Sequence, residues 1–209
     1  MVHALVLVVT INTNNMKKAF LFLMSMFIVI ASHAQSNSEH LTFKGVPIDG
    51  TLSEYVAKMQ SAGFKYWGED DGVAILKGDF AGIKGCTIGV ATLKSTNKVN
   101  TIAVIFPEQD DWVSLENRYE HLKSMLTEKY GEPSECVEKF QGYSNPKTDN
   151  DKLHRVLGDE CTWYTLYRTP KGSIELSVDN ESLFKCFVIL RYFDKINTDA
   201  VRAQAMEDL

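Results

Sequence analysis

Strand-like segments follow one another along this chain in two series, and neither series is interrupted by a helical segment. Seven segments have alternating or continuous apolar side chains typical of strands: 65–69, 73–80, 86–93, 99–106, 162–168, 173–179 and 184–193. Parallel strands need a crossover of a dozen or more residues, whereas antiparallel strands need only a tight turn such as Asp71-Gly72. The sequence therefore predicts an α+β fold with an antiparallel sheet, and it does not support a doubly wound nucleotide-binding fold.

Three segments carry helix signals, and we expect these helices to pack on one face of the sheet. Thr51-x-x-Glu54 has the spacing of a capping box, in which hydroxyl and carboxylate satisfy free backbone amides reciprocally. Asp111 precedes the strongest helical pattern in the chain, and Asn197 is expected to cap a terminal helix. The predicted order is helix, four strands, helix, polar loop at 141–152, three strands, helix.

The N-terminal segment has the three parts of a secretory signal peptide. Lys17 and Lys18 precede an apolar run at 19–31, and Ser32-His33-Ala34 supplies small residues for cleavage before Gln35. A membrane-spanning helix needs about 20 apolar residues, so this run is short for an anchor. We expect residues 1–34 to be a signal peptide, with 1–15 an upstream extension, and the protein to be periplasmic or secreted without a membrane span.

The remaining residues, 35–209, are long enough for one α+β domain, and a chain of this size buries roughly 70% of its unfolded surface. The polar segment 141–152 is the candidate boundary between two halves of that domain. The full chain has 22 basic and 27 acidic residues and a formal charge of −5. This balance repels a phosphate backbone, so we expect no nucleic-acid partner. The sequence carries no signal for an oligomeric state.

All four cysteines lie in the exported part of the chain, where an oxidising compartment permits disulfides. They are candidate disulfide cysteines, and their pairing is open among three connectivities: Cys86, Cys136, Cys161 and Cys186. The alternative is that Cys86 and Cys186, both in apolar strand segments, are buried free thiols. No C-x-x-C pair occurs, so thioredoxin-like redox chemistry and common zinc spacings are unsupported.

No short catalytic motif occurs in this sequence. The patterns of serine hydrolases, P-loop nucleotidases and zinc proteases are all missing, so we assign no catalytic residue and expect no cofactor. The acidic clusters at 69–71 and 149–151 lack the ligand spacing of a calcium loop, so we expect no metal site. An unrecognised hydrolase that uses carboxylates or His154 near the polar loop stays an alternative.

Aromatic residues in the strand segments are the candidate contacts for a ligand or partner. If the outward faces of two strands join, they form an aromatic patch suited to a protein or a carbohydrate. The candidate residues are Tyr66, Trp67, Trp163 and Tyr167. The competing interpretation is ordinary packing of these rings between the sheet and its helices.

Two motifs carry a resemblance to known proteins. Gly78-Asp79-Phe80-Ala81-Gly82 and the helix ending Lys129-Tyr130-Gly131-Glu132-Pro133 resemble a group of small secreted proteins of Bacteroidetes type. This resemblance covers about two thirds of the mature chain, implies export and adds no site residue. The opening of one helix and four strands is similar in outline to the β-lactamase-inhibitor-protein-like fold, whose members often bind other proteins. We expect no second copy of that unit, because the later half is predicted to have three strands and no leading helix.

These observations favour an exported, non-catalytic binding module for a protein or cell-envelope partner. The alternatives are the unrecognised hydrolase and a small-ligand or glycan binder that uses Trp67 or Trp163. An enzyme is the less favoured class, because no catalytic pattern occurs.

Overall fold

The computed structural model describes residues 39–93, 96–142, 144–181 and 185–207. Its main feature is an eight-stranded sheet in which every pair of neighbouring strands is antiparallel. The strands are β3 (Lys65–Asp70), β4 (Val73–Phe80), β5 (Ile83–Leu93), β6 (Lys98–Ile105), β7 (Glu135–Phe140), β8 (Cys161–Thr169), β9 (Gly172–Asn180) and β10 (Cys186–Asp194). The predicted α+β fold with an antiparallel sheet is thus confirmed. The predicted signal peptide and its cleavage site lie outside the described residues, as does Phe184.

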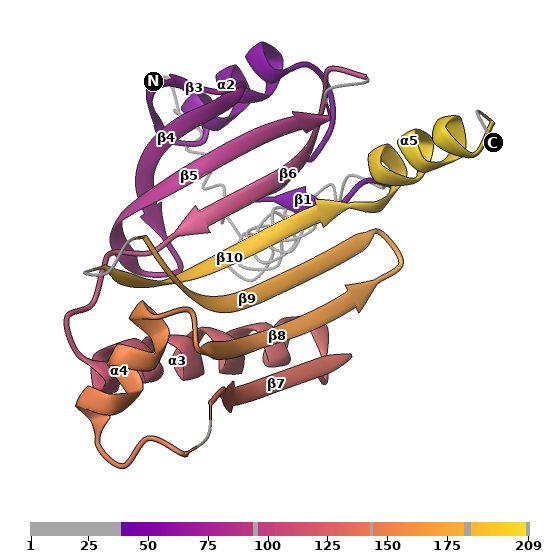
Figure 1. The fold of residues 1–209 in the computed structure, drawn as a ribbon. Helices are drawn as coiled ribbons and strands as arrows, with labels where there is room; N and C mark the ends of the chain where they lie inside the picture. The colour runs from indigo at the N-terminus through magenta and orange to yellow at the C-terminus, as the bar shows by residue number, and fades with distance from the viewer. Residues whose placement is uncertain (1–38, 94–95, 143, 182–184, 208–209) are drawn as a thin grey trace, which may run out of the picture. The chain divides into compact units, whose positions relative to one another are not determined.

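The sheet order, β3-β4-β5-β6-β10-β9-β8-β7, divides the sheet into two similar halves (Figure 1). Helix α2 (Leu52–Ser61) precedes the meander β3 to β6, and helix α3 (Trp112–Tyr130) precedes β7 to β10. The halves join where β6 pairs with β10, with Val104 opposite Leu190. A second unit in which a helix precedes four strands is therefore present, with a further helix between its first two strands, contrary to the expectation from sequence.

The predicted order of elements is wrong because two elements lie in and beside the segment interpreted as a polar loop. Strand β7 is an edge strand with mostly exposed side chains, so it lacks the apolar signal of a central strand. Helix α4 (Asp149–Leu157) begins after a capping box formed by Thr148 and Asp151 and fully buries only Val156. A short hairpin, β1 (Thr42–Phe43) with β2 (Val46–Pro47), also precedes α2.

Several predicted turns and caps are confirmed. Thr51 and Glu54 form the capping box of α2, and the Ser114 amide donates to Asp111 Oδ1 at 2.8 Å at the start of α3. Asp71 and Gly72 both have positive φ, as a tight hairpin turn requires. The two helix caps are strong local signals because their side chains accept hydrogen bonds from backbone amides that have no partner within the helix.

The terminal helix α5 (Lys195–Glu207) begins two residues before the predicted cap. Asp194, fully buried, accepts hydrogen bonds from the amides of Asn197 at 3.0 Å and Leu41 at 2.8 Å, so Asp194 takes the capping position. Nδ1 of His40 lies 3.0 Å from its Oδ2. The side chain of Asn197 instead donates from Nδ2 to the carbonyls of Ile48 and Val99. No helix in the described ranges is long and apolar enough to span a membrane.

The main core lies between the sheet and the helices α2 and α3. α3 contributes its apolar stripe, Trp112, Leu115, Tyr119, Leu122 and Leu126. Phe43 of the β1–β2 hairpin stacks on Phe80 at 5.1 Å and meets Tyr192 edge-on at 5.4 Å. Each fully buried large apolar side chain stabilises the fold by about 1.5–3 kcal/mol. This packing leaves the opposite face of the sheet without α2 or α3.

Candidate functional site

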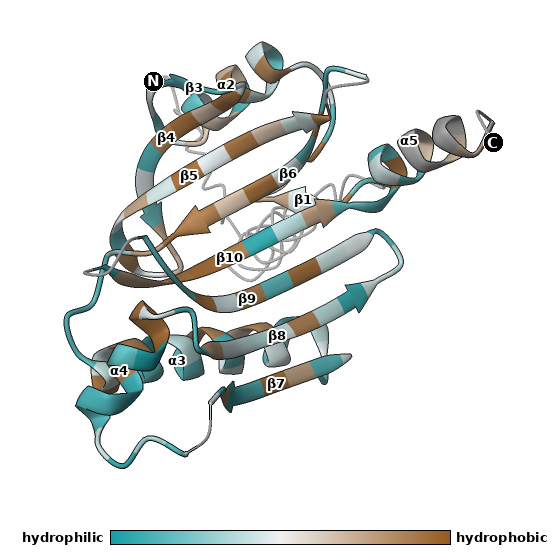
Figure 2. Cartoon of the chain, viewed as in Figure 1, coloured by the Kyte–Doolittle hydropathy of each residue, from teal (hydrophilic) through white to brown (hydrophobic). Residues whose placement is uncertain are grey.

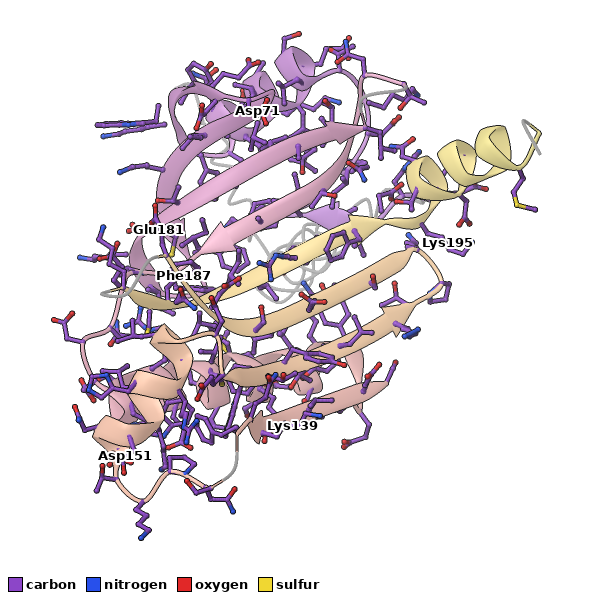
Figure 3. All side chains as sticks on the ribbon, viewed as in Figure 1. Asp71, Lys139, Asp151, Glu181, Phe187 and Lys195 are labelled. Atoms are coloured by element: carbon purple, nitrogen blue, oxygen red, sulfur yellow. The ribbon has the colours of Figure 1, made fainter. Side chains whose placement is uncertain are left out.

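The face of the sheet opposite α2 and α3, here called the open face, is the candidate site. Core side chains such as Ile88, Ile102 and Leu190 point toward the helices, so their strand neighbours point the other way. The open face includes Lys65, Val73, Ile75, Lys77, Thr87, Gly89, Ala91, Thr101, Ala103, Ile105, Phe187, Ile189, Arg191, Phe193, Ser173, Glu175, Ser177, Tyr164, Leu166 and Arg168. Figure 3 shows Phe187 near the start of β10, an inner strand, and Lys139 on the edge strand β7.

Small side chains occupy the open face on β5 and β6. Gly89 lies directly opposite Ala103, and Ala91 lies two residues from Gly89 on the same strand. We call Gly89, Ala91 and Ala103 the small-residue strip. The next strands carry larger side chains: Ile75 of β4 lies opposite Gly89, and Arg191 of β10 lies opposite Ala103. The strip is therefore low between taller neighbours, which leaves room for a protruding side chain of another molecule.

Charged and polar side chains gather on the other half of the open face. Arg191 lies in the sheet beside Ala103, and its guanidinium donates to Glu175, Ser177 and Asp179 at 3.2, 2.8 and 2.8 Å. This bonding holds the Arg191 side chain in one position before any partner arrives, which lowers the entropic cost of binding. Figure 2 shows these polar bands on β9 and β10 beside the apolar and neutral bands of β5 and β6.

Trp67 marks the β3 edge of the open face. A β-bulge between Tyr66 and Gly68 interrupts the pairing with β4 at this residue. The Trp67 side chain is 71% exposed, the highest value among the large hydrophobic residues in the described ranges. The Lys77 ammonium lies 4.6 Å from the centroid of the Trp67 ring, within the range of a cation–π contact.

The four aromatic residues predicted as contacts do not lie together. Tyr66 is 44% exposed and lines a cavity of about 440 Å³ with Val56 and Gln60 of α2, away from Trp67. Tyr167 is buried under α3 and donates from its hydroxyl to the Lys123 carbonyl. The Trp163 ring packs edge-on against Trp112 at 5.0 Å. Only Trp67 of these four is placed on the open face, and the predicted aromatic patch is not formed.

None of the four cysteines, all in the described ranges, is bridged, so the predicted disulfides are not found. Cys86 and Cys186 are buried free thiols, as the alternative predicted. Cys136 lies opposite Thr165 on β8, four residues along that strand from Cys161, so the strand pairing separates these two thiols. Burial raises the pKa of the Cys186 thiol to about 11, and burial next to Cys186 raises that of Cys161 to about 12.

The residues considered for catalysis or metal binding do not converge on a site. His154 is exposed on α4 and does not line the pockets beside Phe193, Lys58 and Val56. A cavity of about 530 Å³ is lined by His40, Asp49, Glu54 and Lys58 at the start of α2. No group of three or more His, Cys, Asp or Glu residues suited to a metal occurs among the described residues.

Sequence analysis missed the residues that distinguish the open face. The alternation in 173–179 did place Glu175 and Ser177 outward, and that part of the pattern was available. The position of Arg191 beside Ala103 depends on the pairing of β10 with β6, which joins strands far apart in sequence. The open face carries apolar side chains, of which Phe187 and Ile189 are buried, the ion-paired Arg191 and the exposed indole of Trp67. Comparisons with protein-family models, curated proteins and solved structures found no match to this chain.

Proposed function

We propose that this protein is an exported, non-catalytic binding module whose open face docks a protein partner. The observation that carries the proposal is the open face itself, in which apolar, small and preset ionic side chains lie on eight paired strands. Export rests on the signal-peptide pattern of residues 1–34. The sequence resemblance to a fold whose members often bind other proteins agrees with this class.

The composition of the open face resembles that of protein interfaces. Binding energy at such interfaces concentrates in Trp, Tyr and Arg side chains, surrounded by contacts that exclude water. Here Arg191 lies near the middle of the sheet, Trp67 lies at one edge, and Tyr164 donates to Glu135 at 2.5 Å near the other. A sheet of eight strands about 4.8 Å apart is wide enough for a standard interface of about 800 Å² per partner.

The test compares two matched substitutions, one on each side of the molecule. Ala103→Gln places a longer polar side chain in the small-residue strip, and Val113→Gln changes a residue of α3 that is 48% exposed. The chain is expressed from residue 1 in source cells with a C-terminal tag, and co-purified proteins are quantified by mass spectrometry. Circular dichroism first establishes that both variants fold.

We expect one stoichiometric partner with the original chain and with Val113→Gln. With Ala103→Gln the amount of recovered partner should fall at least tenfold, because a longer side chain prevents close packing on the strip. In a two-component assay, the purified partner should then bind Ala103→Gln at least tenfold more weakly than it binds the original chain. Equal recovery with Ala103→Gln, or loss with Val113→Gln alone, contradicts docking on the open face.

A further inference from the structure

The β3–β4 edge of the open face carries two lysines in an arrangement that costs stability. Lys65 and Lys77 are cross-strand partners, directly opposite each other in the ladder. Like charges in directly opposite positions destabilise a sheet. Neither ammonium has an ion-pair partner among the described residues. The Lys77 ammonium makes a cation–π contact with the Trp67 ring.

Asp79 follows Lys77 by two residues on β4; its carboxylate accepts the Gly85 amide at 3.1 Å and forms no ion pair with Lys65 or Lys77. Elsewhere on the open face, Arg191 pairs with Glu175 and Asp179, and Arg168 lies 3.8 Å from Glu135. Among the described residues Lys65 and Lys77 are thus two adjacent cations without such a pair, in a chain whose formal charge is −5.

Trp67 adds an apolar contact beside the two cations. Its indole is 71% exposed, and the bulge in β3 projects it from the edge of the sheet. The Lys77 ammonium above the ring leaves that charge close to any group that covers the indole. A partner group that fits here has an apolar side chain to cover Trp67 and negative charges to neutralise Lys65 and Lys77.

From this geometry we infer that Trp67, Lys65 and Lys77 form a subsite for an acidic segment of the protein partner. The inference rests on the proposed function and deepens it by naming the charge of the docked segment. An aromatic or aliphatic side chain of the segment contacts the Trp67 indole, and flanking carboxylates pair with the two ammonium groups. A polypeptide is favoured over a glycan because the subsite continues into a protein-sized face of eight strands.

The subsite is tested with three peptides that differ only in charge: acetyl-EEFEE-amide, acetyl-QQFQQ-amide and acetyl-KKFKK-amide. Each is titrated into the ¹⁵N-labelled chain, and the Trp67 indole and the backbone amides of Lys65 and Lys77 are followed by NMR. We expect saturable shifts with the acidic peptide at millimolar concentration, at least tenfold weaker binding of the basic peptide, and weakening by salt.

Substitutions then assign the binding to the subsite. Lys65→Gln/Lys77→Gln should weaken the acidic peptide about fivefold, because two exposed ion pairs each add a small factor. Trp67→Ala should remove saturable binding. Lys139→Gln, an exposed lysine on β7 of the same face, should leave the affinity unchanged.

Three results overturn the inference: equal affinity for all three peptides, shifts located away from Trp67, or no shift at 10 mM peptide. Saturable binding of a uronic-acid oligosaccharide or of anionic lipid vesicles in place of the acidic peptide also overturns it. Failure here is distinct from failure of the proposed function. If the partner is lost with Ala103→Gln but kept with Lys65→Gln/Lys77→Gln, the open face docks a protein whose acidic segment does not use this subsite.

Discussion

The hydroxyl oxygens of Tyr119 and Thr165 lie 2.5 Å apart, buried between α3 and β8. This bond ties α3 to the sheet of the second half. Thr165→Val keeps the shape of the side chain but leaves the Tyr119 hydroxyl without this hydrogen-bond partner. We expect a loss of about 1–3 kcal/mol in the free energy of unfolding, measured by urea denaturation.

A double-mutant cycle isolates that bond from packing. Tyr119→Phe/Thr165→Val should cost about 1 kcal/mol less than the sum of the two single changes, because it leaves neither hydroxyl unpaired. Thr101→Val on the open face of β6 is the matched control, with an expected change within about 0.5 kcal/mol. Additive single effects at Tyr119 and Thr165 would show that the two hydroxyls do not interact.

The buried carboxylate of Asp194 should be the most sensitive polar group at the β10–α5 junction. Asp194→Asn replaces an oxygen that accepts the Leu41 or Asn197 amide with an NH₂ group, so two donors face each other. We expect a loss of about 2–4 kcal/mol in the free energy of unfolding by urea. Asp199→Asn, an exposed neighbour on α5, should change it by less than about 0.5 kcal/mol. Equal effects of the two substitutions would rule out this role of Asp194.

The helix cap at Asp111 should account for one part of the loss of folding stability in acid. The hydrogen bond from the Ser114 amide holds the pKa of the Asp111 carboxyl below its ordinary value of 3.8. The pKa of this carboxyl is lower in the folded chain than in the unfolded chain. The cap therefore stabilises the fold fully above pH 3.8, and this stabilisation is lost as the pH falls through the folded pKa.

Asp111→Asn keeps a capping oxygen but has no titrating carboxyl. We expect a small change in Tm at pH 7 and a shallower fall in Tm between about pH 4 and pH 2, measured by thermal scans. Asp110→Asn is the control, because the Asp110 side chain makes no hydrogen bond to the described helix amides. If Asp110→Asn flattens the acid branch as much as Asp111→Asn, the assignment to the cap is wrong.

The four free thiols should react at different rates with a disulfide reagent such as Ellman's reagent. Cys136 is exposed and should react first, whereas burial raises the pKa values of Cys86, Cys161 and Cys186 and lowers their thiolate fraction. We expect one fast thiol in the folded protein and four thiols after unfolding without reductant. Fewer than four in the unfolded, unreduced protein would reveal a disulfide.

The parts of the fold that sequence predicted are those with strong local signals. The strand 73–80 has the predicted bounds, and the helix beginning at Trp112 was indicated by apolar residues at helical spacing after Asp111. Strand β7 was missed because an exposed edge strand buries few side chains and therefore needs no apolar alternation. Helix α4 was missed because Asn and Asp residues in its first turn are also typical of loops.

The candidate site depended on strand pairing, which a local pattern does not specify. Trp163 and Tyr164 are neighbours on one strand, so one side chain faces the helices and the other faces the open side of the sheet. Because both are aromatic, the sequence does not distinguish which one faces outward. The contact of Tyr119 with Thr165 fixes the alternation, placing Trp163 with the core and Tyr164 on the open face. Similarly, a bulge determines the position of Trp67, and the pairing of β3 with β4 brings Lys65 opposite Lys77.

The most direct test of the central claim is photo-crosslinking of the full chain in intact source cells. A photoreactive phenylalanine replaces Thr101 on the open face of β6 in one variant and Val113 on α3 in the other. We predict a single protein adduct in high yield from position 101 and none from position 113. A protein adduct from position 113 alone, or equal adducts from both positions, would contradict docking on the open face.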